Sequence, residues 1–76
     1  MEELNLSDRL RLIAGLIKKG SKVADIGTDH GYLPIFLVKS GITDRVIAMD
    51  VRKGPLKKAE DNTRAFCVSD QIELRS

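Results

Sequence analysis

The stretch D-I-G-T-D-H-G-Y-L-P, residues 25–34, decides the fold of this chain of 76 residues. It joins a short apolar run at 23–26, which predicts a strand buried on both faces, to a turn that contains Gly27 and Gly31. A helix is predicted directly after the turn, because Pro34 suits a first helical turn. Strand, glycine turn and helix in this order are typical of nucleotide-type cofactor sites, where helix-start amides and side chains at the strand's carboxyl end face the ligand.

The rest of the chain alternates helices with strands. A first helix is predicted with Ser7 as its cap and Gly20 as its stop. The other predicted elements are a strand at 22–26, a helix at 32–39, a strand at 45–50, a helix at 55–66 that buries Leu56, Ala59, Thr63 and Phe66, and a strand at 71–75. Strands separated by helices predict right-handed crossovers and a parallel sheet with helices on both faces.

The predicted fold class is therefore α/β, in the order helix, strand, helix, strand, helix, strand. Three parallel strands make only the first half of a Rossmann-like, doubly wound sheet, so we expect a truncated sheet with at least one open strand edge. Residues 1–76 are expected to form the amino-terminal portion of one such domain.

Composition excludes several classes of protein. A hydrophobic content of 42% predicts a folded globular chain rather than a disordered one, and a net charge of +2 is too even to identify an anionic partner. The basic group Arg52, Lys53, Lys57 and Lys58 is interpreted as a solvated helix face. An aromatic content of 4% offers no visible platform for stacking nucleotide bases. No metal site is predicted.

Three further observations predict a cytoplasmic protein that has no membrane partner. A single cysteine, Cys67, excludes an internal disulfide and fits a reducing compartment. Met1 is followed by Glu2 and Glu3, unlike the basic start of a signal peptide. No apolar run reaches the length of about 18 residues that would span a membrane.

The acids around the glycine turn indicate the type of ligand. Asp50 ends the strand at 45–50, near the spacing of about 20 residues at which an acid accepts hydrogen bonds from ribose hydroxyls. The alternative is an acid that caps the strand-to-helix turn. The G-x-G-x-x-G pattern of dinucleotide sites is missing, and Asp25 and Asp29 would repel a pyrophosphate, which opposes an NAD-dependent enzyme. Carboxylates suit a cationic ligand such as S-adenosylmethionine, which carries a sulfonium and an amino group.

Two motifs resemble those of a known family. L-S-x-R-L at residues 6–10 followed by A-D-I-G-T-D-H-G-Y-L-P at 24–34 closely resembles the bacterial tRNA adenine N1-methyltransferases that act at position 22, and G-P-L at 54–56 fits the same pattern. The resemblance covers essentially the whole chain. It implies a Rossmann-like domain that binds S-adenosylmethionine, tRNA as the substrate, and further segments after Ser76 that complete the site. We therefore expect this chain to carry the cofactor-binding half and to be inactive alone.

The turn and its surroundings supply the candidate site residues. The predicted cofactor-binding residues are Asp25, Gly27, Thr28, Gly31, Asp50 and Val51. The catalytic candidate is Asp29, which is similar in position to the family's proposed active-site acid and would position adenine or accept a proton from N6. Its alternative role is to bond local backbone amides in the turn. Arg9, His30 and Tyr32 are candidates for substrate contact, with surface solvation, structural hydrogen bonding and packing as their respective alternatives.

A second class of function stays open from the sequence. The chain could be a non-catalytic nucleotide-binding or assembly module that pairs its open strand edge with another chain, and the same edge could support a homo-oligomer.

Overall fold

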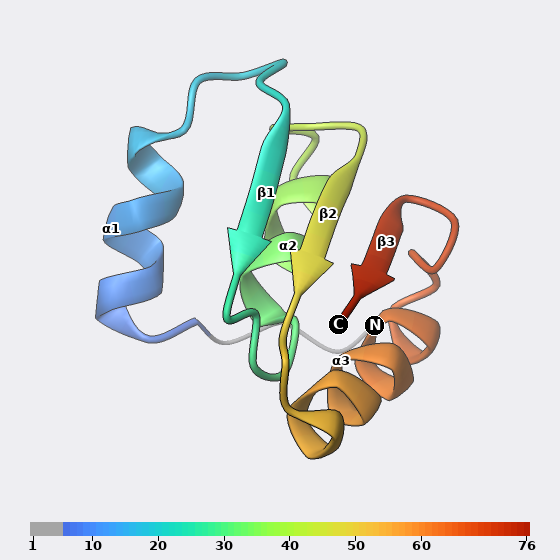
Figure 1. Ribbon diagram of the computed structural model, residues 1–76. Coiled ribbons are helices and arrows are strands. Elements are labelled where there is room, and N and C mark those ends of the chain that lie inside the picture. The colour runs from blue at the N-terminus through green and yellow to red at the C-terminus, as the bar shows by residue number, and fades with distance from the viewer. Residues whose placement is uncertain (1–5) are drawn as a thin grey trace.

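The computed structural model describes residues 6–76 and contains all six predicted elements in the predicted order. They are α1 (Asp8–Leu16), β1 (Val23–Ile26), α2 (Tyr32–Lys39), β2 (Val46–Met49), α3 (Lys53–Ala65) and β3 (Ile72–Arg75) (Figure 1). The α/β class is thereby confirmed. The first three residues, on which the signal-peptide expectation rests, lie outside the described part. Within residues 6–76, no helix has the length and apolar character that crossing a membrane requires.

The three strands form one parallel sheet in the order β1-β2-β3. Val23 of β1, Val46 of β2 and Ile72 of β3 lie side by side in the register. Because β2 is central, β1 and β3 are the two edge strands of the described sheet. In-register neighbours in a parallel sheet point to the same face, so these three valine and isoleucine side chains share one face.

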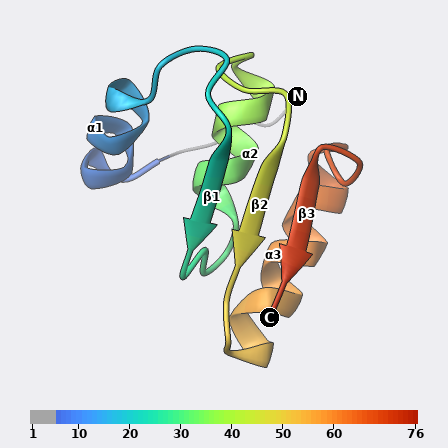
Figure 2. The ribbon, with the colours of Figure 1, turned by 45° about the horizontal axis from the view of Figure 1, so that its top comes forward.

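Both connecting helices cover that same face, so the expectation of helices on both faces is wrong for the described residues. Each connection moves in the same direction across the sheet, and right-handed crossovers then place α2 and α3 on the same side. Figures 1 and 2 show this arrangement. On the other face Ala24 is exposed and Ile26 is 81% exposed. The run at 23–26 is therefore half-buried on one face and exposed on the other, which corrects the prediction of a strand buried on both.

The core lies between the sheet and its helices. Ile35 and Leu37 of α2 are fully buried and pack with Val46 and Ala48 of β2, and Ala14 brings α1 into the same cluster. The predicted inner face of α3 is confirmed: Ala59 and Thr63 are buried, while Leu56 and Phe66 are half-buried.

The sequence predicts the start of the first helix correctly but not its end. Ser7 caps α1 as predicted, since its hydroxyl accepts a hydrogen bond from the amide of Leu10 at 3.3 Å. The helix ends at Leu16, because Ile17 already has extended backbone angles. Gly20 has a positive φ of 84°, but it lies in the following turn rather than at the helix end, which corrects its predicted role.

Candidate functional site

The carboxyl ends of β1 and β2 lie side by side, and this brings the glycine turn to the acid that follows β2 (Figure 1). Ile26 and Met49 are register partners. Just beyond them, the amides of Gly27 and Thr28 both donate hydrogen bonds to the carbonyl oxygen of Met49 at 2.8 Å. The turn is therefore fixed to the end of the neighbouring strand, directly before Asp50.

The carboxylate of Asp50 is buried and fully engaged within the chain, with its side chain only 2% exposed. Its Oδ2 accepts from the amide of Asp29 at 3.2 Å and from Nη2 of Arg52 at 2.9 Å. Its Oδ1 accepts from the amide and from Nε of Arg52 at 2.9 and 3.0 Å. The bonds from Arg52 hold the pKa of Asp50 well below its ordinary value.

Sequence reasoning missed the part played by Arg52. The sequence indicates a solvated side chain like those of the lysines that follow, yet the Arg52 guanidinium binds the buried acid with two parallel bonds. The D-x-R spacing was the available signal, because an aspartate commonly accepts from the amide two residues on and thereby turns the chain. Those contacts also match the alternative interpretation of Asp50 as an acid that orders the strand-to-helix turn.

Asp29 stands in a strained backbone conformation with its side chain open to the site. Its φ is +58°, a region that few residues other than glycine adopt and that aspartate tolerates better than most. Its carboxylate is 57% exposed and lies 3.3 Å from Nδ1 of His30 and 3.9 Å from Nη2 of Arg52. An exposed carboxylate between these two side chains can meet a cationic or proton-donating group.

His30 and Tyr32 form a stacked aromatic pair that the sequence did not reveal. Their ring centroids are 5.5 Å apart and their planes differ by 9°. The backbone of His30 is held from α3, because its carbonyl oxygen accepts a hydrogen bond from Nδ2 of Asn62 at 2.9 Å. These two contacts tie the end of the glycine turn to the start of α2 and to α3.

One cavity of about 430 Å³ gathers most of the predicted site residues. The predicted residues that line it are Arg9, Asp25, Gly27, Thr28, Asp29, His30 and Tyr32. Ser7, Leu10 and Ile13 of the α1 region complete one wall, with Ile26 and Leu33. The amino-terminal L-S-x-R-L segment and the glycine turn thus face the same space.

Three predicted cofactor residues lie outside this lining. Asp50 adjoins it through the amide of Asp29. Val51, the residue after Asp50, is 88% exposed. Gly31 turns toward α3 instead, where an added Cβ would stand 3.1 Å from Cβ of Ala59. The close approach of α2 and α3 therefore requires Gly31, whatever its relation to a ligand.

Two groups in the cavity are suited to a polar ligand. Thr28 is buried, and its Oγ1 makes no hydrogen bond of ordinary geometry within the described chain, although it lies near enough to the Asp25 carboxylate to lower the pKa of that group. Asp25 is half-buried, and burial raises the pKa of its carboxyl. Gly27, with φ of +72°, leaves open space where a side chain would project. A ligand with polar groups could therefore bond both the Thr28 hydroxyl and the Asp25 carboxylate from this cavity.

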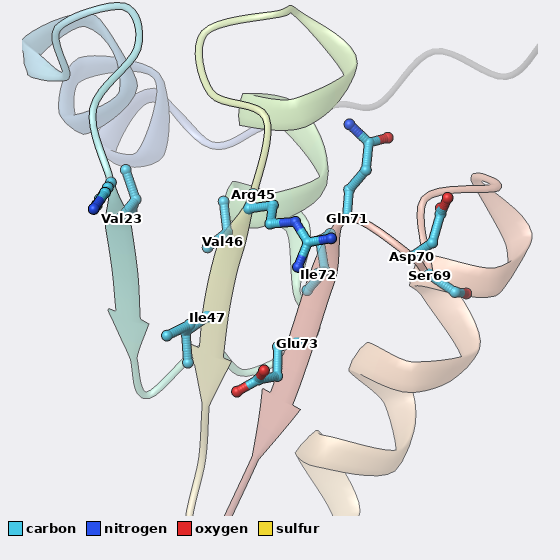
Figure 3. Close-up of a pocket in the computed structure, with 10 residues that line it drawn as sticks. Val23, Arg45, Val46, Ile47, Ser69, Asp70, Gln71, Ile72 and Glu73 are labelled. Carbon is cyan, nitrogen blue, oxygen red and sulfur yellow. The ribbon is translucent and has the colours of Figure 1, made fainter.

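A larger hollow lies at the opposite end of the sheet. Its volume is about 540 Å³, and Figure 3 shows it at the amino ends of the strands, with the side chain of Arg45 extended toward β3. Ligands of open α/β sheets bind at the carboxyl ends of the strands. This hollow is therefore separate from the candidate site. No cluster of three or more metal-ligating side chains occurs among the residues described.

Comparison with known proteins agrees with this geometry. The chain is 36% identical over 75 residues to the tRNA (adenine(22)-N(1))-methyltransferase of Bacillus subtilis (strain 168), which covers 99% of this chain and 32% of that protein. The structure of M. capricolum TrmK in complex with S-adenosyl-homocysteine is 43% identical, with a TM-score of 0.87, over 91% of this chain and 30% of that one. A structure from Streptococcus agalactiae in the NADB-Rossmann superfamily is 40% identical, with a TM-score of 0.92, over 96% and 32%.

These likenesses confirm the Rossmann-like fold and the predicted family resemblance. The chain spans about a third of the length of the relatives it matches. A family profile described as a methyltransferase domain matches residues 6–76, which is nearly all of the sequence. The chain therefore belongs to the family of methyltransferase domains.

Proposed function

We propose that the chain is the cofactor-binding part of an S-adenosylmethionine-dependent methyltransferase that acts on N1 of an adenine in tRNA. Support for this substrate comes from the similarity to the Bacillus subtilis enzyme along 99% of the chain. The match covers 32% of that enzyme, and the residues gathered at the cavity suit the cofactor rather than the tRNA. A tRNA substrate also supports a cytoplasmic location.

The observation that carries the proposal is that the buried Thr28 hydroxyl and the half-buried Asp25 carboxylate lie close together in the lining of one cavity. This pair suits the amino group and carboxylate of the methionine portion. Asp50, at the end of β2, suits the ribose hydroxyls, and the exposed Val51, which follows it, suits an apolar contact with the cofactor. Gly27 lets the ligand approach the backbone closely, and Gly31 sets the start of α2. The residues present therefore fit S-adenosylmethionine.

The chemistry divides between cofactor and chain. S-adenosylmethionine supplies a methyl group made electrophilic by the attached sulfonium. The chain's part is to orient the adenine and to stabilise the positive charge that N1 methylation gives it. The exposed carboxylate of Asp29 can do this, or can accept the proton that leaves N6. Arg9, on the α1 side of the cavity, can meet a phosphate, and the His30–Tyr32 pair can stack with a base.

Calorimetric titration with S-adenosylhomocysteine tests the proposal. We expect binding that Asp50→Ala weakens by more than about tenfold, since two charge-assisted hydrogen bonds to ribose are lost. Asp44→Ala removes an exposed acid outside the cavity and should bind as the unaltered chain does. Asp50→Asn is a second variant that keeps the shape of the buried side chain. Equal binding by both Asp50 variants would remove the ribose assignment.

The open sheet edges favour one other function, assembly with a second chain. β1 and β3 each have an unpaired side in the described sheet, and each is four residues long. Size measurement in solution separates the two functions. A dimer that forms whether or not S-adenosylhomocysteine is present would support assembly, whereas a monomer that binds the ligand supports the enzyme.

A further inference from the structure

Arg52 occupies the acceptor positions of the Asp50 carboxylate that the proposed function assigns to the ribose hydroxyls. An ionised carboxylate offers about four lone-pair positions to donors. On Asp50 four donors are present: the amide of Asp29, and the amide, Nε and Nη2 of Arg52, at 2.9 to 3.2 Å. The carboxylate is therefore saturated by this chain. Two ribose hydroxyls can bind it only if two of the four donors leave.

The four donors differ in how easily they can leave. The two amides belong to the backbone of the turns around the site, so they stay with the fold. The two side-chain donors belong to a guanidinium whose side chain is 61% exposed and which is not part of the hydrophobic core cluster. Nη2 of Arg52 also lies 3.9 Å from Oδ1 of Asp29, which offers the released guanidinium another anionic partner.

The geometry of the two donors matches that of the ligand. Nε and Nη2 reach Oδ1 and Oδ2 respectively, so the guanidinium spans the carboxylate as a fork. Vicinal hydroxyls of a ribose present two adjacent donors in the same way. The two ribose hydroxyls can therefore replace Nε and Nη2 of Arg52 while the two backbone amides continue to orient the carboxylate.

We propose that Arg52 is a positioning residue that holds the ribose-binding face of Asp50 and yields it to the vicinal hydroxyls of the cofactor, and so sets the affinity of the site. This inference rests on the proposed function. It predicts competition: the cofactor must displace a bidentate ion pair, and its affinity is lower by the strength of that pair. Arg52 then moves toward Asp29, where the substrate is expected.

Titrations of Arg52→Met with three probes test the competition. We expect this variant to bind S-adenosylhomocysteine and adenosine roughly two- to fivefold more tightly than the unaltered chain, because the ligand no longer has to displace an ion pair whose arginine is exposed. Affinity for 2′,3′-dideoxyadenosine, which lacks the hydroxyls, should not change. The matched control is Arg64→Met, which removes a similarly exposed arginine that pairs with Glu60. Its affinity for all three probes should equal that of the unaltered chain.

A second measurement needs no substitution. The Nε–H proton of Arg52 should exchange slowly with water in the free protein and rapidly when S-adenosylhomocysteine saturates it, as followed by nitrogen-15 NMR. Binding of S-adenosylhomocysteine that leaves this proton slow, or that Arg52→Met weakens, would overturn the displacement while leaving the proposed function intact. No binding by either protein would overturn the proposed function itself, and the inference with it.

Discussion

The amide of Asp29 donates a hydrogen bond to Oδ2 of Asp50 at 3.2 Å, although the two residues are 21 positions apart in sequence. This bond ties the acid after β2 to the turn after β1, in which Asp29 has a φ of +58°. Such a conformation is costly for a residue with a side chain and persists where surrounding contacts fix it. The proposed ribose acid therefore also positions the proposed catalytic acid.

Asp29→Asn separates the charge of this residue from its backbone role. Asparagine tolerates a positive φ about as well as aspartate, so the turn and its bond to Asp50 should be kept. In the longer enzyme that the proposed function requires, we expect turnover on tRNA to fall about a hundredfold or more, the usual contribution of a positioned acid or base. Affinity for S-adenosylhomocysteine should stay the same, as should turnover of Asp44→Asn. An active Asp29→Asn enzyme would exclude this carboxylate from the reaction.

The low pKa of Asp50 predicts how stability depends on pH. Hydrogen bonds from Arg52 lower this pKa from the ordinary value of 3.8, so the folded state holds the carboxylate in its charged form more strongly than the unfolded state does. The resulting stability is present above the unfolded-state pKa of about 4 and is lost as pH falls toward the folded-state pKa. Urea unfolding over this acidic range should show a steeper loss for the unaltered chain than for Arg52→Met. Equal slopes would contradict a stabilising role for this ion pair.

The two glycines of the turn should respond differently to the same substitution. Gly27 and Gly31 both have positive φ, so a change to alanine strains either one by about 1 kcal/mol. At Gly31 the new Cβ would also stand 3.1 Å from Cβ of Ala59, which adds an overpacking cost of roughly 1–3 kcal/mol. Thermal unfolding should therefore show the larger loss for Gly31→Ala.

The same two variants should affect cofactor binding in the opposite order, with the larger loss of affinity for Gly27→Ala. Gly27→Ala places a methyl group where the structure has open space at the cavity, and we expect weaker binding of S-adenosylhomocysteine with only a modest loss of stability.

Adding Ala59→Gly to Gly31→Ala should recover the part of the stability loss that comes from overpacking against α3, as a double-mutant cycle would measure. Additive effects of the two changes would show that α3 does not constrain Gly31.

The sequence predicts local structure well here because most signals are local. Pro34 and Gly41 mark the two ends of α2, and the observed helix, Tyr32–Lys39, has the predicted bounds. The error at Ile26 is topological, since an apolar residue in a strand does not reveal which face of the sheet the helices cover. The strand order decides that, and it depends on contacts distant in sequence.

In the candidate site, too, features that depend on local signals could be predicted from the sequence, and features that depend on packing could not. The strand ends and the spacing to Asp50 predicted which residues would meet, because carboxyl ends of parallel strands lie at one edge. The saturation of Asp50 by Arg52 was not predicted, since a basic residue in a basic cluster has the same pattern whether it is solvated or paired. Likewise the contact between Gly31 and Ala59 depends on how closely α2 and α3 approach, which spacing does not specify.

Cys67 offers a test of backbone strain away from the site. After α3 the amide of Cys67 donates to the carbonyl of Arg64, and that of Val68 donates to the carbonyl of Thr63. After α2 the amides of Gly41 and Ile42 make the same pair of bonds. Both helices thus end in the left-handed motif that favours glycine, but in α3 the left-handed position holds Cys67, with φ of 60°.

We therefore expect Cys67→Gly to raise the free energy of unfolding by about 0.5–1 kcal/mol, because relief of the left-handed strain outweighs the extra entropy of glycine in the unfolded chain. Chemical denaturation measures this gain. Cys67→Ala is the matched control: it removes the thiol but keeps Cβ, so its stability should not rise. The side chain of Cys67 is exposed and does not line the candidate cavity, so S-adenosylhomocysteine affinity should be the same in both variants. Equal stability of the glycine and alanine variants would show that the end of α3 is not strained by Cβ.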